Sequence, residues 1–232
     1  MEPGVVKAMI LAAGVGERMR PLTDHTPKPL LQVGGVPLIE HHIRRLALAG
    51  FTELVINVSH LATQITDFCD DGGRWGVSIE WSPEKEPLET AGGIFNALPL
   101  LGSGPFLVVN GDIWIEYPFQ RLLDYPLAAE ATAHLVLVAN PPQHPLGDFR
   151  LERDGTVHAR AHNSAGLTYA GVGIYTPALF SGMQPGKLPL RPLLDRDIAR
   201  GLITGEYHAG DWVDVGTPRR LRELDAAVRN RA

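Results

Sequence analysis

The stretch Leu11-Ala12-Ala13-Gly14-Val15-Gly16-Glu17-Arg18-Met19 decides the fold of this chain, because it ends an apolar run over residues 5–13 with two nearby glycines. A strand that leads into a glycine-rich loop is typical of open α/β sheets, in which ligands bind at the carboxyl ends of the strands. Gly14 and Gly16 can adopt φ values that other residues avoid, and small residues let backbone N–H groups approach phosphate oxygens. A tight turn without a ligand would explain the glycine pair equally well.

Strand and helix patterns alternate on the carboxyl side of this loop. Apolar residues at helical spacing predict helices over residues 37–49, 61–68 and 90–98, and short apolar or β-branched runs predict strands over residues 54–58, 77–81 and 106–110. Alternation of this kind predicts a Rossmann-like α/β fold, with a mostly parallel central sheet and helices on both faces.

The second half of the chain has a different texture. Strands are predicted over residues 133–138, 148–151, 157–159 and 169–175 with few helices between them, which indicates a smaller, more antiparallel subregion. Helices return over residues 191–200 and 218–229, on either side of a predicted strand over residues 212–215. No Ser/Gly-rich linker or internal repeat divides the chain, so we expect a single domain over residues 1–232.

Composition excludes several classes of protein. The net charge is −5 and no long basic run occurs, which argues against nucleic acid as a partner. No run of 18 apolar residues and no amino-terminal signal pattern occurs, so neither a membrane span nor export is expected. A single cysteine, Cys69, excludes an intramolecular disulfide and indicates packing in a reducing compartment. We therefore expect a cytoplasmic protein.

Two common phosphate loops can be tested against the glycine-rich stretch. The Walker pattern fails because no Gly-Lys-Ser/Thr comes after it, and the dinucleotide fingerprint fails because Met19 occupies the third glycine position. The chain continues instead through Arg18 to Pro27-Lys28-Pro29-Leu30, a proline-stiffened segment that places two cations close to the glycines. Such cations can neutralise phosphate charge.

Two aspartates lie at the ends of predicted strands. Asp112 closes Asn110-Gly111-Asp112, and Asp214 lies in Trp212-Val213-Asp214. Taken singly, each aspartate would be explained by a turn cap or a salt bridge. Taken together with the loop, they offer the hard oxygen ligands that Mg²⁺ prefers. The arginines near the carboxyl end, Arg219, Arg220, Arg222, Arg229 and Arg231, are interpreted as the solvated face of a helix.

The pattern Leu-Ala-Ala-Gly-x-Gly-x-Arg-Met-x-Pro-x-Thr-x3-Pro-Lys-Pro-Leu over residues 11–30 resembles the signature of sugar-1-phosphate nucleotidyltransferases. The resemblance implies a GT-A-like fold that transfers a nucleoside monophosphate from a nucleoside triphosphate to a sugar 1-phosphate and releases pyrophosphate. It also implies catalytic roles for Arg18, Lys28, Asp112 and Asp214, with Mg²⁺ held by the two aspartates. The implied nucleotide-binding residues in the loop are Leu11, Ala12, Ala13, Gly14 and Gly16.

Residues 84–93, Glu-Lys-Glu-Pro-Leu-Glu-Thr-Ala-Gly-Gly, resemble the segment that lines the nucleobase in this family, where Glu89 stands at a position that is either glycine or glutamate. The resemblance implies that Glu84, Thr90 and Gly92 bind the nucleotide. A carboxylate such as Glu84 could accept a hydrogen bond from a ring N–H of uracil or guanine, whereas a solvated loop glutamate is the alternative. The choice of base stays open.

For the sugar, the resemblance implies Gly147, Asp148 and Gly171, with Asn163 as a further candidate. Gly171 could equally mark a bulge in its strand. The Glu-Lys-Pro motif of many relatives is missing near residues 160–163, and Lys187 is a possible substitute.

Three segments point to a substrate pair. Asn110-Gly111-Asp112, Gly-Asp-Phe-Arg-Leu over residues 147–151 and Trp-Val-Asp-Val-Gly-Thr over residues 212–217 look most like short family members that use UTP and N-acetylmuramate 1-phosphate in peptidoglycan recycling. Mannose 1-phosphate with GTP, or glucose 1-phosphate, are the alternatives within the family. A non-catalytic sugar-nucleotide sensor is the alternative outside it. The sequence predicts no particular oligomeric state.

Overall fold

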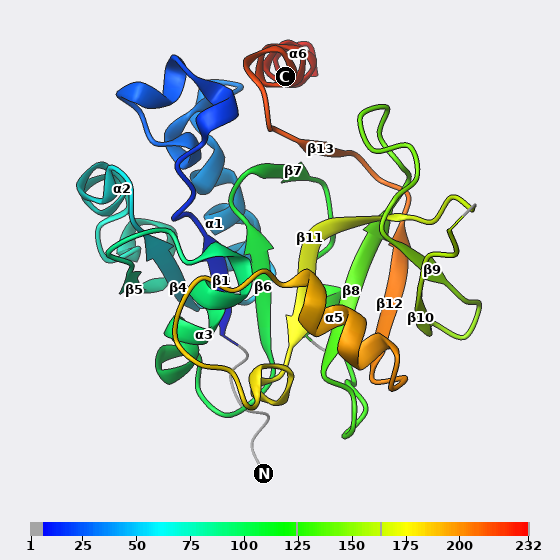
Figure 1. Cartoon of the computed structure of the whole chain (residues 1–232). Coiled ribbons are helices and arrows are strands. Elements are labelled where there is room, and N and C mark those ends of the chain that lie inside the picture. Colours follow the sequence, from blue (N-terminus) through cyan, green and yellow to red (C-terminus); the bar gives the residue numbers. More distant parts are fainter. Residues whose placement is uncertain (1–6, 124, 163, 232) are drawn as a thin grey trace.

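A seven-stranded sheet forms the centre of the protein in the computed structural model, which describes residues 7–123, 125–162 and 164–231 (Figure 1). Its strand order is β12-β8-β11-β6-β1-β4-β5, and β11 alone runs antiparallel to its neighbours in the sheet. The strands are β1 (Ala8–Leu11), β4 (Glu53–Val58), β5 (Ser78–Pro83), β6 (Phe106–Asn110), β8 (Ala133–Val138), β11 (Thr168–Tyr175) and β12 (Ile203–His208). The predicted mostly parallel sheet is confirmed.

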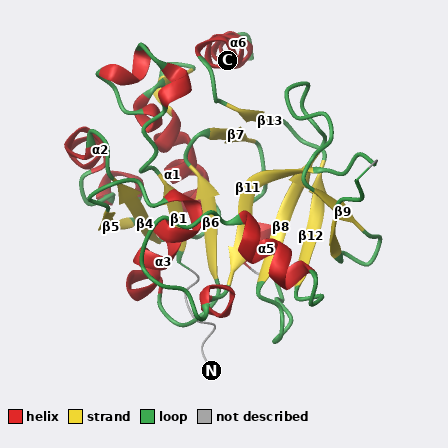
Figure 2. Cartoon of the chain, in the orientation of Figure 1, coloured by secondary structure: helices red, strands yellow, loops and turns green. Residues whose placement is uncertain are grey.

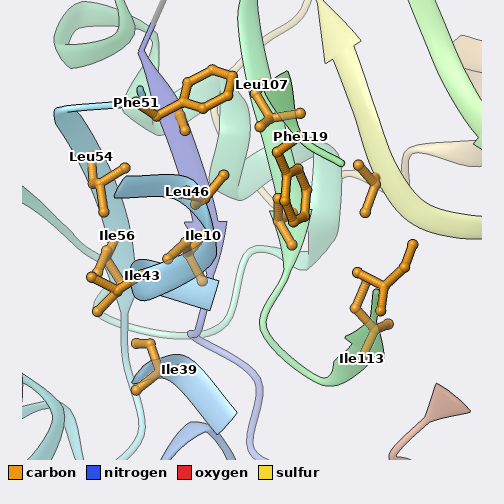
Figure 3. Packing of buried hydrophobic residues seen from close by; sticks show 14 of the residues in the cluster. Ile10, Ile39, Ile43, Leu46, Phe51, Leu54, Ile56, Leu107, Ile113 and Phe119 are labelled. Carbon is orange, nitrogen blue, oxygen red and sulfur yellow. The ribbon is translucent and has the colours of Figure 1, made fainter. Parts of the chain in front are cut away.

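Helices cover both faces of this sheet because its strands alternate apolar side chains between the two sides (Figure 2). Ile10 packs in one cluster with α1 (Leu38–Leu48) and α2 (Ala62–Cys69), and its neighbour Met9 packs in another with α3 (Glu89–Leu101) and α5 (Arg191–Ile198). Figure 3 shows the first of these clusters, where α1 supplies Ile39, Ile43 and Leu46.

Shorter elements lie around the main sheet. Three two-stranded ribbons pair β2 (Gln32–Val33) with β3 (Val36–Pro37), β7 (Ile113–Ile115) with β13 (Trp212–Asp214), and β9 (Phe149–Leu151) with β10 (Val157–Ala159). The described residues also form the short helix α4 (Gln120–Leu123), the long helix α6 (Pro218–Arg229) and five 3₁₀ turns, at Glu17–Met19, Leu22–Asp24, Lys28–Leu30, Gly73–Trp75 and Pro177–Phe180.

The expectation of a more antiparallel second half is confirmed, since β11 and the ribbons of β7 with β13 and of β9 with β10 pair in antiparallel. The sequence patterns predict no strand at β12, which pairs in parallel with β8, so that both strands extend the main sheet beyond β11. Within the main sheet, β11 supplies the antiparallel strand pairs. The strand predicted over residues 5–13 is shorter than expected, since β1 spans Ala8–Leu11 and residues 1–6 lie outside the described part of the chain.

A third, smaller cluster fixes the carboxyl-terminal helix. Met19 after the glycine-rich loop, Trp114 in β7 and Leu221 and Leu224 in α6 pack together, with Val215 between β13 and the helix. The amino-terminal loop, the β7–β13 ribbon and α6 therefore share one core, although they are far apart in the sequence.

Two expectations from composition can be compared with the structure. Cys69 is fully buried, and burial raises the pKa of its thiol to about 12, which agrees with a packing role. None of the helices in the described ranges is both long and apolar enough to cross a bilayer.

Candidate active site

The carboxyl ends of three neighbouring strands form the floor of the site. Leu11 in β1 is in register with Asn57 in β4 on one side and with Asn110 in β6 on the other. The N–H of Ala12 donates to Asn57 Oδ1 at 2.7 Å, and the N–H of Gly111 donates to the Leu11 carbonyl oxygen at 2.9 Å. Position 111 requires glycine, since a Cβ there would lie 2.5 Å from that carbonyl oxygen.

A cavity of about 560 Å³ opens above this floor, within the usual size range of small-molecule sites. The structure brings most of the predicted nucleotide and catalytic residues to its wall: Leu11, Ala12, Ala13, Gly14, Gly16, Arg18, Lys28, Glu84, Thr90 and Asp112. We call this cavity the nucleotide pocket. Gly92 lies instead against another loop, because a Cβ there would come within 2.4 Å of the Gly186 carbonyl oxygen.

Lys28 and Asp112 form an ion pair at this wall. Their Nζ and Oδ2 atoms are 2.7 Å apart, and Lys28 is only 7% exposed. Gly16 makes the approach of Lys28 to the loop possible, since its φ is +70° and a Cβ there would lie 3.3 Å from the Lys28 Cβ. The Thr23 hydroxyl also donates to the Gly16 carbonyl oxygen at 2.9 Å. The ammonium is therefore held at a fixed place beside the loop.

The β7–β13 ribbon brings the two aspartates to one edge of the sheet. Asp214 pairs with Ile113, the residue after Asp112, and the N–H of Val215 donates to the Asp112 carbonyl oxygen at 3.0 Å. Asp214 also accepts a hydrogen bond from Arg220 Nη1 at 2.7 Å. Arg220 is thus an exception to the predicted solvated arginine face, because only 16% of its side chain is exposed.

Helix α1 holds the same ribbon through backbone carbonyl oxygens. Arg45 Nη1 donates to the Ile115 carbonyl oxygen at 2.5 Å and its guanidinium lies 4.2 Å from the Trp114 ring centroid, while His42 Nε2 is 2.9 Å from the Ile113 carbonyl oxygen. Burial lowers the pKa of His42 to about 4, so the imidazole is neutral near pH 7 and Nε2 acts as the donor. Both residues steady the strand that comes after Asp112.

The donor set at this edge suits a hard cation only in part. Asp112 and Asp214 offer carboxylate oxygens, but the described residues contain no group of three or more His, Cys, Asp or Glu side chains placed to hold a metal. Mg²⁺ is commonly held by one or two carboxylates together with substrate phosphates and water, so the pair fits that ion when a phosphorylated ligand completes the shell.

Glu84 is buried and hydrogen-bonded, so the alternative of a solvated loop glutamate is wrong. Its Oε1 accepts from Asn57 Nδ2 at 2.7 Å, and its Oε2 accepts from the N–H of Leu88 at 2.9 Å. Gly93 leaves room for this contact, since a Cβ there would lie 2.7 Å from Glu84 Oε1. Together with the Ala12 bond to Asn57, the contact ties the glycine-rich loop to the segment that carries Glu84.

A second cavity, of about 250 Å³, adjoins the first. We call it the acceptor pocket. Arg18, Asn110 and Asp112 line both cavities, whereas Asp214 and Gly171 line the acceptor pocket alone. Gly171 has φ +78°, and the β8–β11 register shifts between Tyr169 and Gly173, so the predicted bulge is present at a residue that also faces the cavity.

Among the described residues, the other sugar candidates do not line this wall. Gly147 and Asp148 lie next to it, in the segment that leads into β9. Lys187 pairs with Glu86 at 2.8 Å, more than half exposed, and lines neither cavity. Asn163 lies outside the described residues.

Sequence reasoning missed several residues of the two pockets. Asn57 is one of them, although a single amide at the end of an otherwise apolar strand is a usable signal. Gln143, His144 and Trp212 line the acceptor pocket, and the first two lie in a loop without any periodic pattern. Glu89 lines the nucleotide pocket with φ +61°, which explains why the family pattern allows glycine at this position.

The arrangement can join two phosphorylated molecules. Two adjoining cavities meet at Arg18 and Asp112, and Lys28 lies beside the meeting point on the nucleotide side. Positioned cations at such a point can hold two anionic phosphates in contact and neutralise charge as one displaces part of the other.

Comparisons with known proteins agree with this geometry. Residues 7–231 match the nucleotidyl transferase family. An N-acetylmuramate alpha-1-phosphate uridylyltransferase of Neisseria meningitidis is 52% identical over 225 residues, which cover 95% of this chain and 97% of the relative. The enzyme of the same name from Caulobacter vibrioides is 38% identical, over 95% of this chain and 96% of its own length. A solved structure from Bacillus anthracis, described as a glucose-1-phosphate thymidylyltransferase, shares the fold with a TM-score of 0.86 at 22% identity, covering 97% of this chain and 96% of its own.

The family match spans nearly the whole chain and both relatives exceed 30% identity over almost their full length, so the resemblance inferred from residues 11–30 is confirmed and this chain belongs to the nucleotidyl transferase family.

Proposed function

We propose that this protein transfers UMP from UTP to N-acetylmuramate 1-phosphate, giving UDP-N-acetylmuramate and pyrophosphate. The observation that carries the proposal is the pair of adjoining cavities that share Arg18, Asn110 and Asp112, since a nucleotidyl transfer needs a nucleotide site and an acceptor site that meet at one phosphate. The choice of UTP and N-acetylmuramate is supported by the name of the relative that is 52% identical.

The chain's own residues supply positioning and charge. The backbone of residues 11–16 and the guanidinium of Arg18 hold the triphosphate, and Lys28 neutralises charge near the α-phosphorus. A sugar phosphate is an anion at neutral pH, so no general base is required for its oxygen to attack the α-phosphorus in line. Pyrophosphate leaves on the side of the glycine-rich loop.

We also propose that the reaction depends on Mg²⁺, which Asp112 and Asp214 would hold. When bound, the ion would neutralise phosphate charge and orient the reacting groups. Lys28 and Arg220 neutralise the same carboxylates in the protein alone. We further propose that the reaction takes place in the cytoplasm and belongs to the recycling of peptidoglycan sugars.

A pyrophosphate-release screen tests the proposal. UTP, GTP and dTTP are each combined with the 1-phosphates of N-acetylmuramate, mannose and glucose, with MgCl₂ or with EDTA. We expect turnover to be fastest for UTP with N-acetylmuramate 1-phosphate and to be lost with EDTA. A preference for GTP and mannose 1-phosphate would reassign the substrates. Calorimetric binding of nucleotide and sugar without turnover of any pair would favour the sensor instead.

A further inference from the structure

The loop between β8 and β9 contributes Pro141, Gln143 and His144 to the acceptor pocket and nothing to the nucleotide pocket. Arg18 and Asp112, in contrast, line both cavities. If the acceptor's phosphate lies at the shared residues, where the reaction occurs, the 141–144 loop contacts the part of the acceptor that distinguishes one sugar from another.

This loop is held in one shape. Asn140 Nδ2 donates to the Gly166 carbonyl oxygen at 2.8 Å, and Asn140 Oδ1 accepts from the Thr168 hydroxyl at 2.9 Å. Gly147, with φ +65°, closes the loop against Asn140, because a Cβ there would lie 2.4 Å from Asn140 Oδ1. The packing of the loop therefore explains the glycine at position 147, which the sequence predicts as a sugar-binding residue.

Asp148, the second predicted sugar residue, is already occupied by protein groups. Its Oδ2 accepts from the N–H of Tyr169 at 2.9 Å, and its Oδ1 lies 3.1 Å from His144 Nε2 and 3.8 Å from Arg191 Nη1. The carboxylate therefore orients the His144 ring, which keeps its second nitrogen for another partner. A protonated imidazole donates from both nitrogens.

The charged side chains that line the acceptor pocket indicate what the His144 ring can bind. Among the described residues that line the pocket, Arg18 and His144 are the side chains able to carry a positive charge. Arg18 also belongs to the nucleotide pocket and is committed to phosphate. An acidic group on the sugar ring therefore has one basic side chain left, His144, among these lining residues.

We propose that His144, oriented by Asp148 and flanked by Gln143, binds a carboxylate on the acceptor sugar and determines its specificity. This inference rests on the proposed function, because N-acetylmuramate differs from N-acetylglucosamine only by a lactyl ether that carries a carboxylate. It makes His144 a substrate contact and Asp148 a positioning residue.

Binding of two nucleotide sugars tests the role of His144. UDP-N-acetylmuramate and UDP-N-acetylglucosamine share the nucleotide, so the ratio of their Kd values, measured by calorimetry, isolates the lactyl group. We expect the wild-type protein to bind UDP-N-acetylmuramate more tightly. His144→Ala should weaken that complex about 10- to 100-fold, the range of a charge-assisted hydrogen bond, and leave UDP-N-acetylglucosamine within about threefold.

Two further variants keep the test decisive. His144→Gln retains an amide N–H for Asp148 and hence the loop, and should still lose most of the preference because it carries no charge. His158→Ala removes a histidine of the neighbouring β10 that lines neither pocket, and should change neither Kd.

An equal loss of affinity for both nucleotide sugars would show that His144 only holds the loop, and an unchanged ratio of Kd values in both His144 variants would show that the carboxylate binds elsewhere. Either result overturns the inference. Failure of the proposed function is a separate result, namely absence of wild-type turnover of UTP with N-acetylmuramate 1-phosphate. Turnover of that pair by a wild-type protein that binds both nucleotide sugars equally overturns the inference alone.

Discussion

The substitution Glu84→Gln separates two roles for this residue, reading of the nucleobase and support of the pocket. It removes the charge with almost no change of shape. In the structure both carboxylate oxygens accept hydrogen bonds, from Asn57 Nδ2 at 2.7 Å and from the N–H of Leu88 at 2.9 Å. A glutamine has one oxygen, so its NH₂ group must face one of these two donors.

The expected cost derives from burial. Glu84 is 7% exposed, and a buried donor that loses its acceptor costs about 1–3 kcal/mol. At about 2–4 °C per kcal/mol for a domain of this size, the melting temperature should fall by about 2–12 °C. Gly93→Ala should also lower the melting temperature, because the new Cβ would lie 2.8 Å from Asn57 Nδ2 and disturb the hydrogen bond between Asn57 and Glu84. Glu86→Gln is the matched control and should leave the melting temperature nearly unchanged. The Glu86 side chain is 67% exposed and pairs with Lys187 at the surface, where ion pairs contribute little to stability.

Thermal unfolding followed by circular dichroism measures the stability, and steady-state kinetics with UTP, GTP and dTTP measures base selection. We expect Glu84→Gln and Gly93→Ala to melt earlier and to lower kcat/KM for all three nucleotides by similar factors, because the loop that holds every nucleotide has moved. A Glu84→Gln protein that melts like the wild type but loses its preference for UTP would refute this reasoning and make Glu84 a base-reading residue.

Three other predictions concern charge, protonation and backbone strain. We expect kcat to fall by about 100-fold or more in each of three variants, Lys28→Met, Asp112→Asn and Asp214→Asn. The melting temperature should change little, since these side chains place charge at the site and do not belong to the hydrophobic core. Near-normal kcat in all three variants would contradict the mechanism. Burial lowers the pKa of His134 to about 4, so the unfolded chain binds a proton at this histidine first, and His134 should lower the free energy of unfolding by up to about 1.4 kcal/mol per pH unit as pH drops from about 6.5 towards 4. His134→Leu should remove this share of the slope in urea titrations at several pH values and leave the share of His42, and an unchanged slope would contradict the prediction. Glu89→Gly should raise the free energy of urea unfolding by up to about 1 kcal/mol, because it relieves the left-handed backbone at φ +61°, and a clear loss of stability would argue against strain there.

Sequence alone predicts the features that local patterns determine. The helix over residues 218–229 and the strands over residues 106–110 and 133–138 are predicted with their observed bounds, because caps, turns and apolar periodicity lie within each segment. The phosphate loop is predictable for the same reason, since its glycines, arginine and lysine are close together in the sequence. The ends of predicted strands also point to both aspartates.

Residues whose role depends on distant partners cannot be predicted in this way. Asn57 joins Ala12, 45 positions away, to Glu84, 27 positions away, and neither separation leaves a trace in periodicity. The three-residue strand β7 is too short to give a pattern, yet its pairing with the predicted strand β13 brings Asp214 to Asp112. The loop with His144 has no pattern at all, so only the structure assigns it to a pocket.

The carboxyl-terminal helix α6 supports the site, although its many arginines suggest only a solvated surface. Two carboxylates at one sheet edge repel each other, and the folded chain offsets this by giving each a cation, Lys28 for Asp112 and Arg220 for Asp214. Arg220 is placed by α6, whose Leu221 packs with Met19 of the glycine-rich segment, so the same apolar contacts that fix the end of the chain also set the charge balance beside the loop. Arg219, one residue earlier, is 80% exposed and pairs with Glu223 of its own helix. Within one run of arginines, burial therefore separates the residue that supports the site from a neighbour that faces solvent.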